Sequence, residues 1–136
     1  MKTIPVVGTL IIVLCLLSGC ASSPPPEEPG ITRIDTLTAK EFFDRGVLFI
    51  DVRGDSYDDG HIPGSTNIYW RGELNEKTLG DAASKSQEVV FYCDGPSCGL
   101  SIKASRAAVS WGYTKVYHYR DGYPAWEAAG YPIEKK

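Results

Sequence analysis

Residues 88–100 read EVVFYCDGPSCGL, and this stretch decides both the fold and the chemistry to expect. The apolar run at 89–92 is typical of a strand that is buried on both faces of a parallel sheet. It ends directly in Cys93, which a loop rich in glycine and proline separates from a helical pattern. Active sites in such sheets form beyond the carboxyl ends of the strands. Cys93 is therefore expected where a protein of this architecture carries its reactive group.

The surrounding sequence alternates strand and helix signals. Further strands are predicted at 31–34, 47–50 and 115–119. The first predicted helix has capping-box spacing, with Thr38 as N-cap and Glu41 reaching back to it. Two more predicted helices follow, one with an apolar stripe at Leu100, Ala104, Ala107, Ala108 and Trp111, and a short one at 125–129.

This alternation predicts an α/β fold for residues 31–136. The expected architecture is a three-layer sandwich, with a mostly parallel sheet and helices on both faces. The full chain of 136 residues carries 14 Lys and Arg against 17 Asp and Glu, a formal net charge of −3. A nucleic-acid partner is not expected, because binding phosphates requires clustered basic side chains.

The expected surroundings of Cys93 favour a nucleophile. Backbone N–H groups at the start of the following helix should face the sulfur, lower the pKa of the thiol and form a cradle for anions. The expected substrate-binding loop comprises Asp94, Gly95, Pro96, Ser97, Cys98, Gly99, Leu100 and Ser101. The alternative interpretation is a buried structural cysteine.

Four segments together resemble a single-domain rhodanese, a family of sulfurtransferases. They are DVR at 51–53, GHIPGSTN at 60–67, FYC at 91–93, and YRDGYPAW at 119–126 with GYPI at 130–133. The resemblance covers residues 34–134 and implies the rhodanese-like fold. It also implies that Cys93 takes sulfane sulfur from a small donor such as thiosulfate, becomes a persulfide, and passes the sulfur to cyanide or a thiol.

The resemblance implies no cofactor and no metal, and a monomer is expected. Asp51 and Arg53 are expected to form an ion pair that supports the fold near the active face. His61 is expected to be structural, as in the matching family segment, and His118 is not expected to take part directly in the chemistry.

The loop departs from the family pattern in two ways. It is about two residues longer, which in related families goes with phosphate or arsenate chemistry. It also lacks the arginine of the C-x5-R motif that those phosphatases and arsenate reductases need, because the sixth residue after Cys93 is Gly99. Phosphatase activity is therefore not expected, and the use of thiosulfate, a dianion, is open to question. The nearest basic residues in the following helix are Lys103 and Arg106.

Cys98 lies five residues after Cys93, and its role is open. It could form a disulfide with Cys93, act as a resolving thiol, or have no redox consequence. Two other functions therefore stand beside sulfur transfer: a thiol-disulfide redox protein that uses both cysteines, and a binding module without turnover.

Residues 1–19 are expected to be a signal peptide. Lys2 precedes an apolar stretch at 4–17 that is shorter than the roughly 20 residues of a membrane span. The sequence LSGC at 17–20 resembles the lipobox of bacterial lipoproteins, which implies cleavage before Cys20 and its lipidation. The alternative is an ordinary signal peptide with an accidental cysteine. Residues 20–30 are expected to be a Pro-rich tether that buries nothing.

This N-terminal pattern predicts a lipid-anchored domain in the cell envelope, facing the periplasm. Ala21 after the cysteine favours the outer membrane if the host is Gram-negative. Several acyl chains on one residue give stable anchoring, where a single chain gives only marginal binding.

Overall fold

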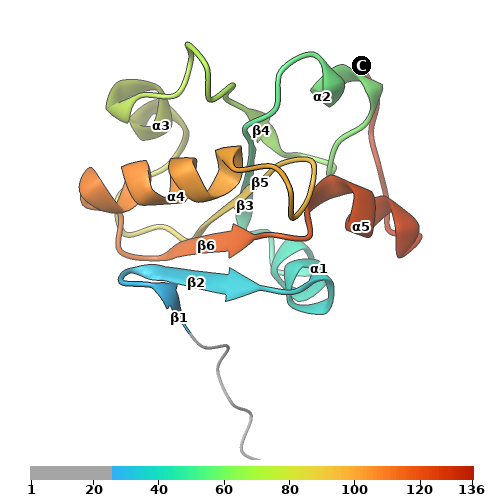
Figure 1. The fold of residues 1–136 in the computed structure, drawn as a ribbon, viewed down its shortest axis with the longest axis horizontal. Coiled ribbons are helices and arrows are strands. Elements are labelled where there is room, and N and C mark those ends of the chain that lie inside the picture. The colour runs from blue at the N-terminus through green and yellow to red at the C-terminus, as the bar shows by residue number, and fades with distance from the viewer. Residues whose placement is uncertain (1–25) are drawn as a thin grey trace, which may run out of the picture.

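The computed structural model describes residues 26–136. Their six strands form one sheet in the order β1-β2-β6-β5-β3-β4. The strands are β1 Pro26–Glu28, β2 Ile31–Ile34, β3 Leu48–Asp51, β4 Thr66–Asn67, β5 Val89–Tyr92 and β6 Val116–Tyr119. Strand β1 runs antiparallel to β2, and all other neighbours are parallel, as Figure 1 shows for β2 and β6. The predicted mostly parallel sheet is confirmed.

Five helices accompany the sheet. They are α1 Thr36–Asp44, α2 Ser56–Asp59, α3 Glu76–Ala82, α4 Leu100–Ser110 and α5 Gly122–Ala128. Side chains of α3 and α4 share one buried cluster with Phe91, and side chains of α1 and α5 share another with Tyr92. Because neighbouring residues of a strand point to opposite faces, β5 is covered on both sides. The predicted three layers are confirmed.

The predicted N-cap of the first helix is wrong, because the helix begins before Thr38. Thr38 is not the N-cap, because Asp35 holds that position and its carboxylate accepts a hydrogen bond from the Thr38 backbone N–H at 2.8 Å. Aspartate is among the strongest N-cap residues, and its use adds residues 36–38 to the helix. The short elements α2, α3 and β4 are not predicted from the sequence, although Asn75 and Thr78 form a capping box at the start of α3.

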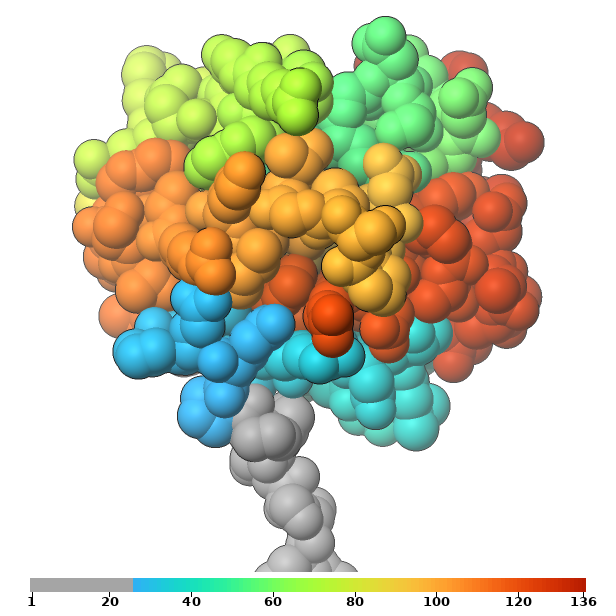
Figure 2. Space-filling model, viewed as in Figure 1, coloured from blue at the N-terminus to red at the C-terminus, as the bar shows by residue number. Residues whose placement is uncertain are grey.

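The predicted tether at 20–30 is too long. Residues 26–28 are strand β1 at the edge of the sheet, paired with β2 through a turn that contains Pro29 and Gly30. Gly30 has a φ of +81°, which suits the third position of a type II turn after proline. Figure 2 shows the surface of this hairpin adjoining that of α4. The folded domain therefore includes residues 26–30. Sequence reasoning assigns them to the tether because local composition does not reveal pairing with a neighbouring strand.

The signal peptide and the lipid attachment at Cys20 lie outside the described residues, so they stay predictions. Within residues 26–136, no helix is long and apolar enough to cross a membrane.

Candidate active site

Cys93 lies immediately after β5, at the carboxyl end of the parallel strands, as the sequence predicts. Its side chain is buried, with 1% of the residue exposed. Its backbone carbonyl accepts a hydrogen bond from the N–H of Tyr123 at 2.9 Å, which ties the site to α5. Strand β5 on one side and α5 on the other thus fix the position of the cysteine backbone.

The predicted substrate-binding loop forms a turn over Cys93. The N–H of Cys98 donates to the carbonyl of Gly95 at 3.0 Å, and Pro96 lies between them. The exposed residues of this loop are Asp94, Pro96, Ser97 and Gly99, while Cys98 and Leu100 are half-buried and Gly95 and Ser101 are buried. The exposed tip would meet a substrate first, and the sulfur lies beneath it.

The Cys93 sulfur lies close to polar groups of Ser101 and Cys98. The Ser101 Oγ lies 3.1 Å from it, and the thiol donates to the backbone carbonyl of Cys98 at 3.4 Å. Burial first, and then the neighbouring Cys98 side chain, raise the pKa of the Cys93 thiol to about 11, against the smaller lowering effect of hydrogen bonds from Ser101.

The prediction of a lowered thiol pKa is therefore wrong. A carbonyl group accepts the thiol proton, and this bond stabilises the neutral form of Cys93. Burial outweighs the favourable electrostatics of the helix start, because desolvation disfavours any thiolate in an apolar surrounding. At neutral pH the resting cysteine is a thiol, so it must lose its proton before it can act as a nucleophile.

Beyond Ser101 the hydrogen bonds continue to two further residues. The Ser101 Oγ lies 2.9 Å from Nε2 of His118, and Nδ1 of His118 lies 2.6 Å from the Glu27 carboxylate. Sequence reasoning discounted His118 and placed Glu27 in the tether. The signal that was present is the position of His118 in a buried strand beside β5, where a charged or polar side chain needs a partner.

Asp51 and Arg53 form the predicted ion pair, and it is almost fully buried. Arg53 donates to both carboxylate oxygens of Asp51, with 2.7 Å as the shortest distance, and to the carbonyl of Gly60 at 2.7 Å. Its Nη1 also reaches the carboxylate of Asp94 at 3.3 Å. Although burial opposes it, hydrogen bonding and charge attraction from Asp51 raise the pKa of Arg53.

The predicted structural role of His61 fits its surroundings. Its ring stacks on that of Tyr57 with the two ring centroids 3.8 Å apart, and Nδ1 of His61 lies 2.9 Å from the backbone carbonyl oxygen of Tyr57. In the same segment, the N–H of Ile62 donates to the hydroxyl of Tyr92 at 3.1 Å. This segment is therefore hydrogen-bonded to β5, the strand that directly precedes Cys93.

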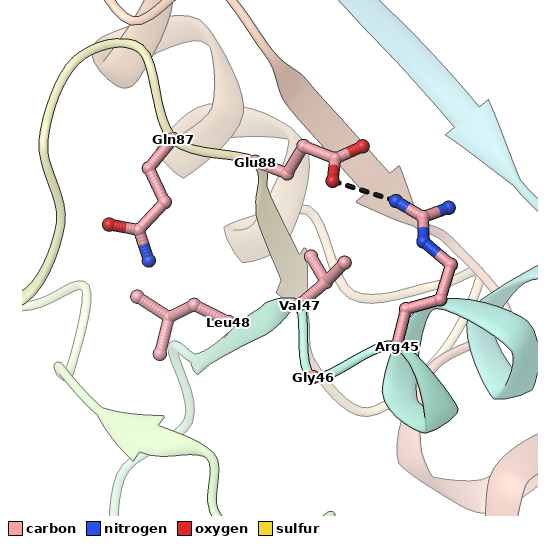
Figure 3. Close-up of a pocket in the computed structure, with 6 residues that line it drawn as sticks. All are labelled: Arg45, Gly46, Val47, Leu48, Gln87 and Glu88. Atoms are coloured by element: carbon pink, nitrogen blue, oxygen red, sulfur yellow. Dashed lines mark hydrogen bonds and ion pairs between the residues drawn. The ribbon is translucent and has the colours of Figure 1, made fainter.

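A shallow hollow lies away from Cys93, at the amino ends of β3 and β5 (Figure 3). Its volume is about 160 Å³, and an ion pair between Arg45 and Glu88 at 2.7 Å borders it. It is lined by Arg45, Gly46, Val47, Leu48, Gln87 and Glu88. None of these is a thiol, hydroxyl or imidazole group, so the hollow offers no nucleophile.

Among residues 26–136, both cysteines are free thiols and no group of three or more His, Cys, Asp or Glu side chains is arranged to hold a metal ion. Cys98 approaches Cys93 through its backbone carbonyl.

Comparison with known proteins agrees with this geometry. Residues 36–129 match the family described as rhodanese-like domain. Rhodanese-like domain-containing protein 17 of Arabidopsis thaliana is 30% identical over an alignment 118 positions long, gaps included, which covers 79% of this chain and 75% of that protein. An HTH-type transcriptional regulator of Mycobacterium tuberculosis is 33% identical over 109 residues, 79% of this chain, but the chain spans only 46% of the regulator.

A solved structure shows the same fold. The rhodanese-like domain of the Alr3790 protein from Anabaena superposes with a TM-score of 0.66 at 26% identity, covering 76% of this chain and 79% of that one. The buried Cys93 thus lies in an α/β sandwich of known type. It follows a parallel strand and lies beneath a loop that leads into a helix. The chain belongs to the rhodanese-like domain family.

Proposed function

We propose that this domain is a sulfurtransferase in which Cys93 carries sulfane sulfur as a persulfide. The family includes sulfurtransferases. The observation that carries the proposal is the position of Cys93, which follows β5 directly and lies beneath the exposed turn that leads into α4. Cys93 belongs to the buried apolar cluster of β5 and α4, and its contact with the Ser101 hydroxyl, which leads on to His118, favours a chemical role over a purely structural one.

The reaction has two displacement steps. The thiolate of Cys93 attacks the outer sulfur of a donor R–S–S⁻, a new S–S bond forms, and R–S⁻ leaves with the electrons of the broken bond. An acceptor, cyanide or a thiolate, then attacks the outer sulfur of the Cys93 persulfide. The second step releases thiocyanate or a new persulfide and restores the Cys93 thiolate, so no external oxidant or reductant is needed.

The charges around the loop favour a donor with little negative charge. Asp94 is exposed beside Cys93, and residues 93–102 contain no Lys or Arg. Arg53 reaches the loop, but its charge is compensated by Asp51 and Asp94. We therefore expect small persulfides or polysulfides to react faster than thiosulfate, whose two negative charges meet no Lys or Arg within the loop. The missing arginine of C-x5-R also argues against phosphate and arsenate chemistry.

The direct test measures thiocyanate formation from cyanide with thiosulfate and with glutathione persulfide as donors. The wild-type chain should transfer sulfur, and Cys93→Ala should not. Intact-mass analysis after donor treatment should show an added mass of about 32 Da, one sulfur, on the wild type and none on Cys93→Ala. Equal rates for the two proteins would overturn the proposal.

We further propose that lipidated Cys20 anchors this domain in the cell envelope. The support is the pattern at residues 1–20, with a short apolar stretch followed by LSGC. Metabolic labelling with a palmitate analogue should modify the wild-type chain expressed in a bacterium, while Cys20→Ala should stay unlabelled. Equal labelling, or none in either, would remove this part of the proposal.

A further inference from the structure

We propose that Ser101, His118 and Glu27 form a proton relay that takes the proton from the Cys93 thiol. The relay rests on the proposed sulfur transfer and supplies its first step, the formation of the nucleophile. Ser101 touches the reacting sulfur, whereas His118 and Glu27 act through it as positioning residues.

The four side chains form one continuous line of hydrogen bonds. From the sulfur of Cys93 the distances are 3.1 Å to Ser101 Oγ, then 2.9 Å to His118 Nε2, and finally 2.6 Å from His118 Nδ1 to Glu27. Each residue comes from a different part of the fold: the end of β5, the first turn of α4, β6 and β1. Because four separate elements bring them together, the line is not a product of local sequence spacing.

The directions of the hydrogen bonds are mutually consistent. If Nδ1 of His118 carries a proton, it donates to the Glu27 carboxylate and leaves Nε2 as an acceptor. The Ser101 hydroxyl then donates to Nε2. Its oxygen accepts from the Cys93 thiol once the thiol proton turns from the Cys98 carbonyl to Ser101, which lies nearer to the sulfur. The thiol proton moves to Ser101 as the hydroxyl proton moves to Nε2. The products are a Cys93 thiolate and a His118 imidazolium, whose charge the Glu27 carboxylate balances.

Burial shows where this line meets solvent. Cys93 and Ser101 are each 1% exposed and His118 is 3% exposed, whereas the Glu27 side chain is 24% exposed. The imidazole is therefore shielded from water and held by two partners. Proton exchange with solvent is expected at the Glu27 end of the line, while the sulfur is reached from the loop side.

Glu27 is the direct counter-ion of His118, because the other charged groups near the imidazole are paired elsewhere or exposed. Glu28 on β1 is occupied by Arg106 of α4, whose Nε donates to it at 2.8 Å. Arg33 is exposed at the position on β2 beside His118, and the neighbour on β5 is apolar Phe91. On α4 the facing group is the neutral hydroxyl of Ser101, and at the sulfur end the further titratable group is the Cys98 thiol.

The site needs such a relay because the thiol does not ionise readily by itself. Burial and the Cys98 side chain raise the pKa of Cys93 to about 11, and residues 94–102 contain no Lys or Arg. A neutral imidazole within reach of the thiol proton, through one hydroxyl, is the kind of group that acts as a general base near neutral pH.

The test follows alkylation of Cys93 by iodoacetamide, which needs a thiolate but no sulfur donor. All proteins are full-length chains carrying Cys98→Ser, and peptide mass spectrometry measures the rate at Cys93 from pH 6.5 to pH 10. His118→Gln removes the proton acceptor, and Glu27→Gln keeps a hydrogen-bonding side chain but removes the charge. Glu28→Gln is the matched control, because it removes a neighbouring carboxylate that pairs with Arg106.

At neutral pH we expect His118→Gln to slow alkylation about tenfold or more, Glu27→Gln to slow it severalfold, and Glu28→Gln to leave it within about twofold of the parent. The differences should shrink towards pH 10, because hydroxide then removes the thiol proton without the relay. Ser101→Thr, which keeps a hydroxyl, should retain more of the rate than Ser101→Ala.

Rates that match the parent in both His118→Gln and Glu27→Gln would overturn the relay. A slowing by the same factor at every pH would also overturn it, since that is the signature of a merely disturbed structure. The proposed sulfur transfer fails separately: a normal alkylation profile without thiocyanate formation would keep the relay and remove the sulfurtransferase.

Discussion

Gly122 lies directly against the backbone of Cys93. A Cβ atom on Gly122 would overlap the Cys93 carbonyl oxygen and come within 2.7 Å of the Gly95 nitrogen. The residue also has a φ of +69°, in the left-handed region. The start of α5 can therefore approach the loop after β5 only because residue 122 has no side chain.

Gly122→Ala should destabilise the protein by about 3 kcal/mol, because backbone strain and overlap with the loop add together. Gly130→Ala is the control, since Gly130 has a φ of +73° and no atom near its Cβ position. It should lose only the strain, about 1 kcal/mol. Urea unfolding measures both, and equal losses would show that the contact with Cys93 does not constrain the fold.

Arg53→Met should lower the free energy of unfolding by about 3 to 5 kcal/mol, because it leaves the Asp51 carboxylate buried without its partner. Lys77→Met is the control, since it breaks an exposed ion pair with Asp81 and should change stability little. Adding Asp51→Asn to Arg53→Met should restore part of the loss. Similar small effects for both single variants would contradict the assigned role of the buried pair.

Stability should fall at alkaline pH in a way that depends on Cys93. The thiol has a pKa raised from the ordinary 9.0 to about 11 in the folded protein, so above pH 9 the unfolded chain releases a proton that the folded chain keeps. This favours unfolding, and its contribution grows to about 1 kcal/mol between pH 8 and pH 10.

Urea unfolding at these two pH values should therefore show a smaller fall for Cys93→Ala than for the wild type. Tyrosines with raised pKa values, such as Tyr119 at about 12, contribute equally to both proteins. Parallel falls would mean that the Cys93 thiol has an ordinary pKa.

Cys98→Ser should still acquire one sulfur atom on Cys93 when treated with a persulfide donor. The contact between the two residues uses the Cys98 backbone carbonyl, which serine retains. A redox protein would instead lose the intramolecular disulfide, seen in the air-oxidised wild type as a mass lower by about 2 Da. Intact-mass analysis of both proteins, with and without donor, separates the two functions.

The sequence was sufficient for the central strands and for the position of Cys93. Strand β5 is a continuous apolar run, and β3 and β6 are apolar or aromatic except for Asp51 and His118; such runs predict strands covered on both faces. The ion pair of Asp51 and Arg53 could be expected because the DVR segment follows a buried strand. These features depend on local patterns, which a single sequence displays.

The remaining features depend on contacts between distant segments. The polar composition of Pro26–Glu28 suggests a linker, and only pairing with β2 makes it a strand. The raised pKa of Cys93 results from burial and from the approach of the Cys98 side chain, neither of which the loop sequence displays. The sequence places His118 in a strand but does not indicate that β1 and α4 bring Glu27 and Ser101 to opposite sides of its ring.

Strand β1 also affects how the sheet can meet other molecules. It covers the outer edge of β2, and at the opposite edge β4 has only two residues. The new edge is three residues long and begins with a proline that has no amide hydrogen. It carries two glutamates, of which Glu28 is paired with Arg106 and Glu27 is hydrogen-bonded to His118. Short, charged edges with proline are poor templates for strand addition from another chain. The first residues of the domain thus protect it from edge-to-edge aggregation, a hazard that grows when many copies are concentrated on one surface.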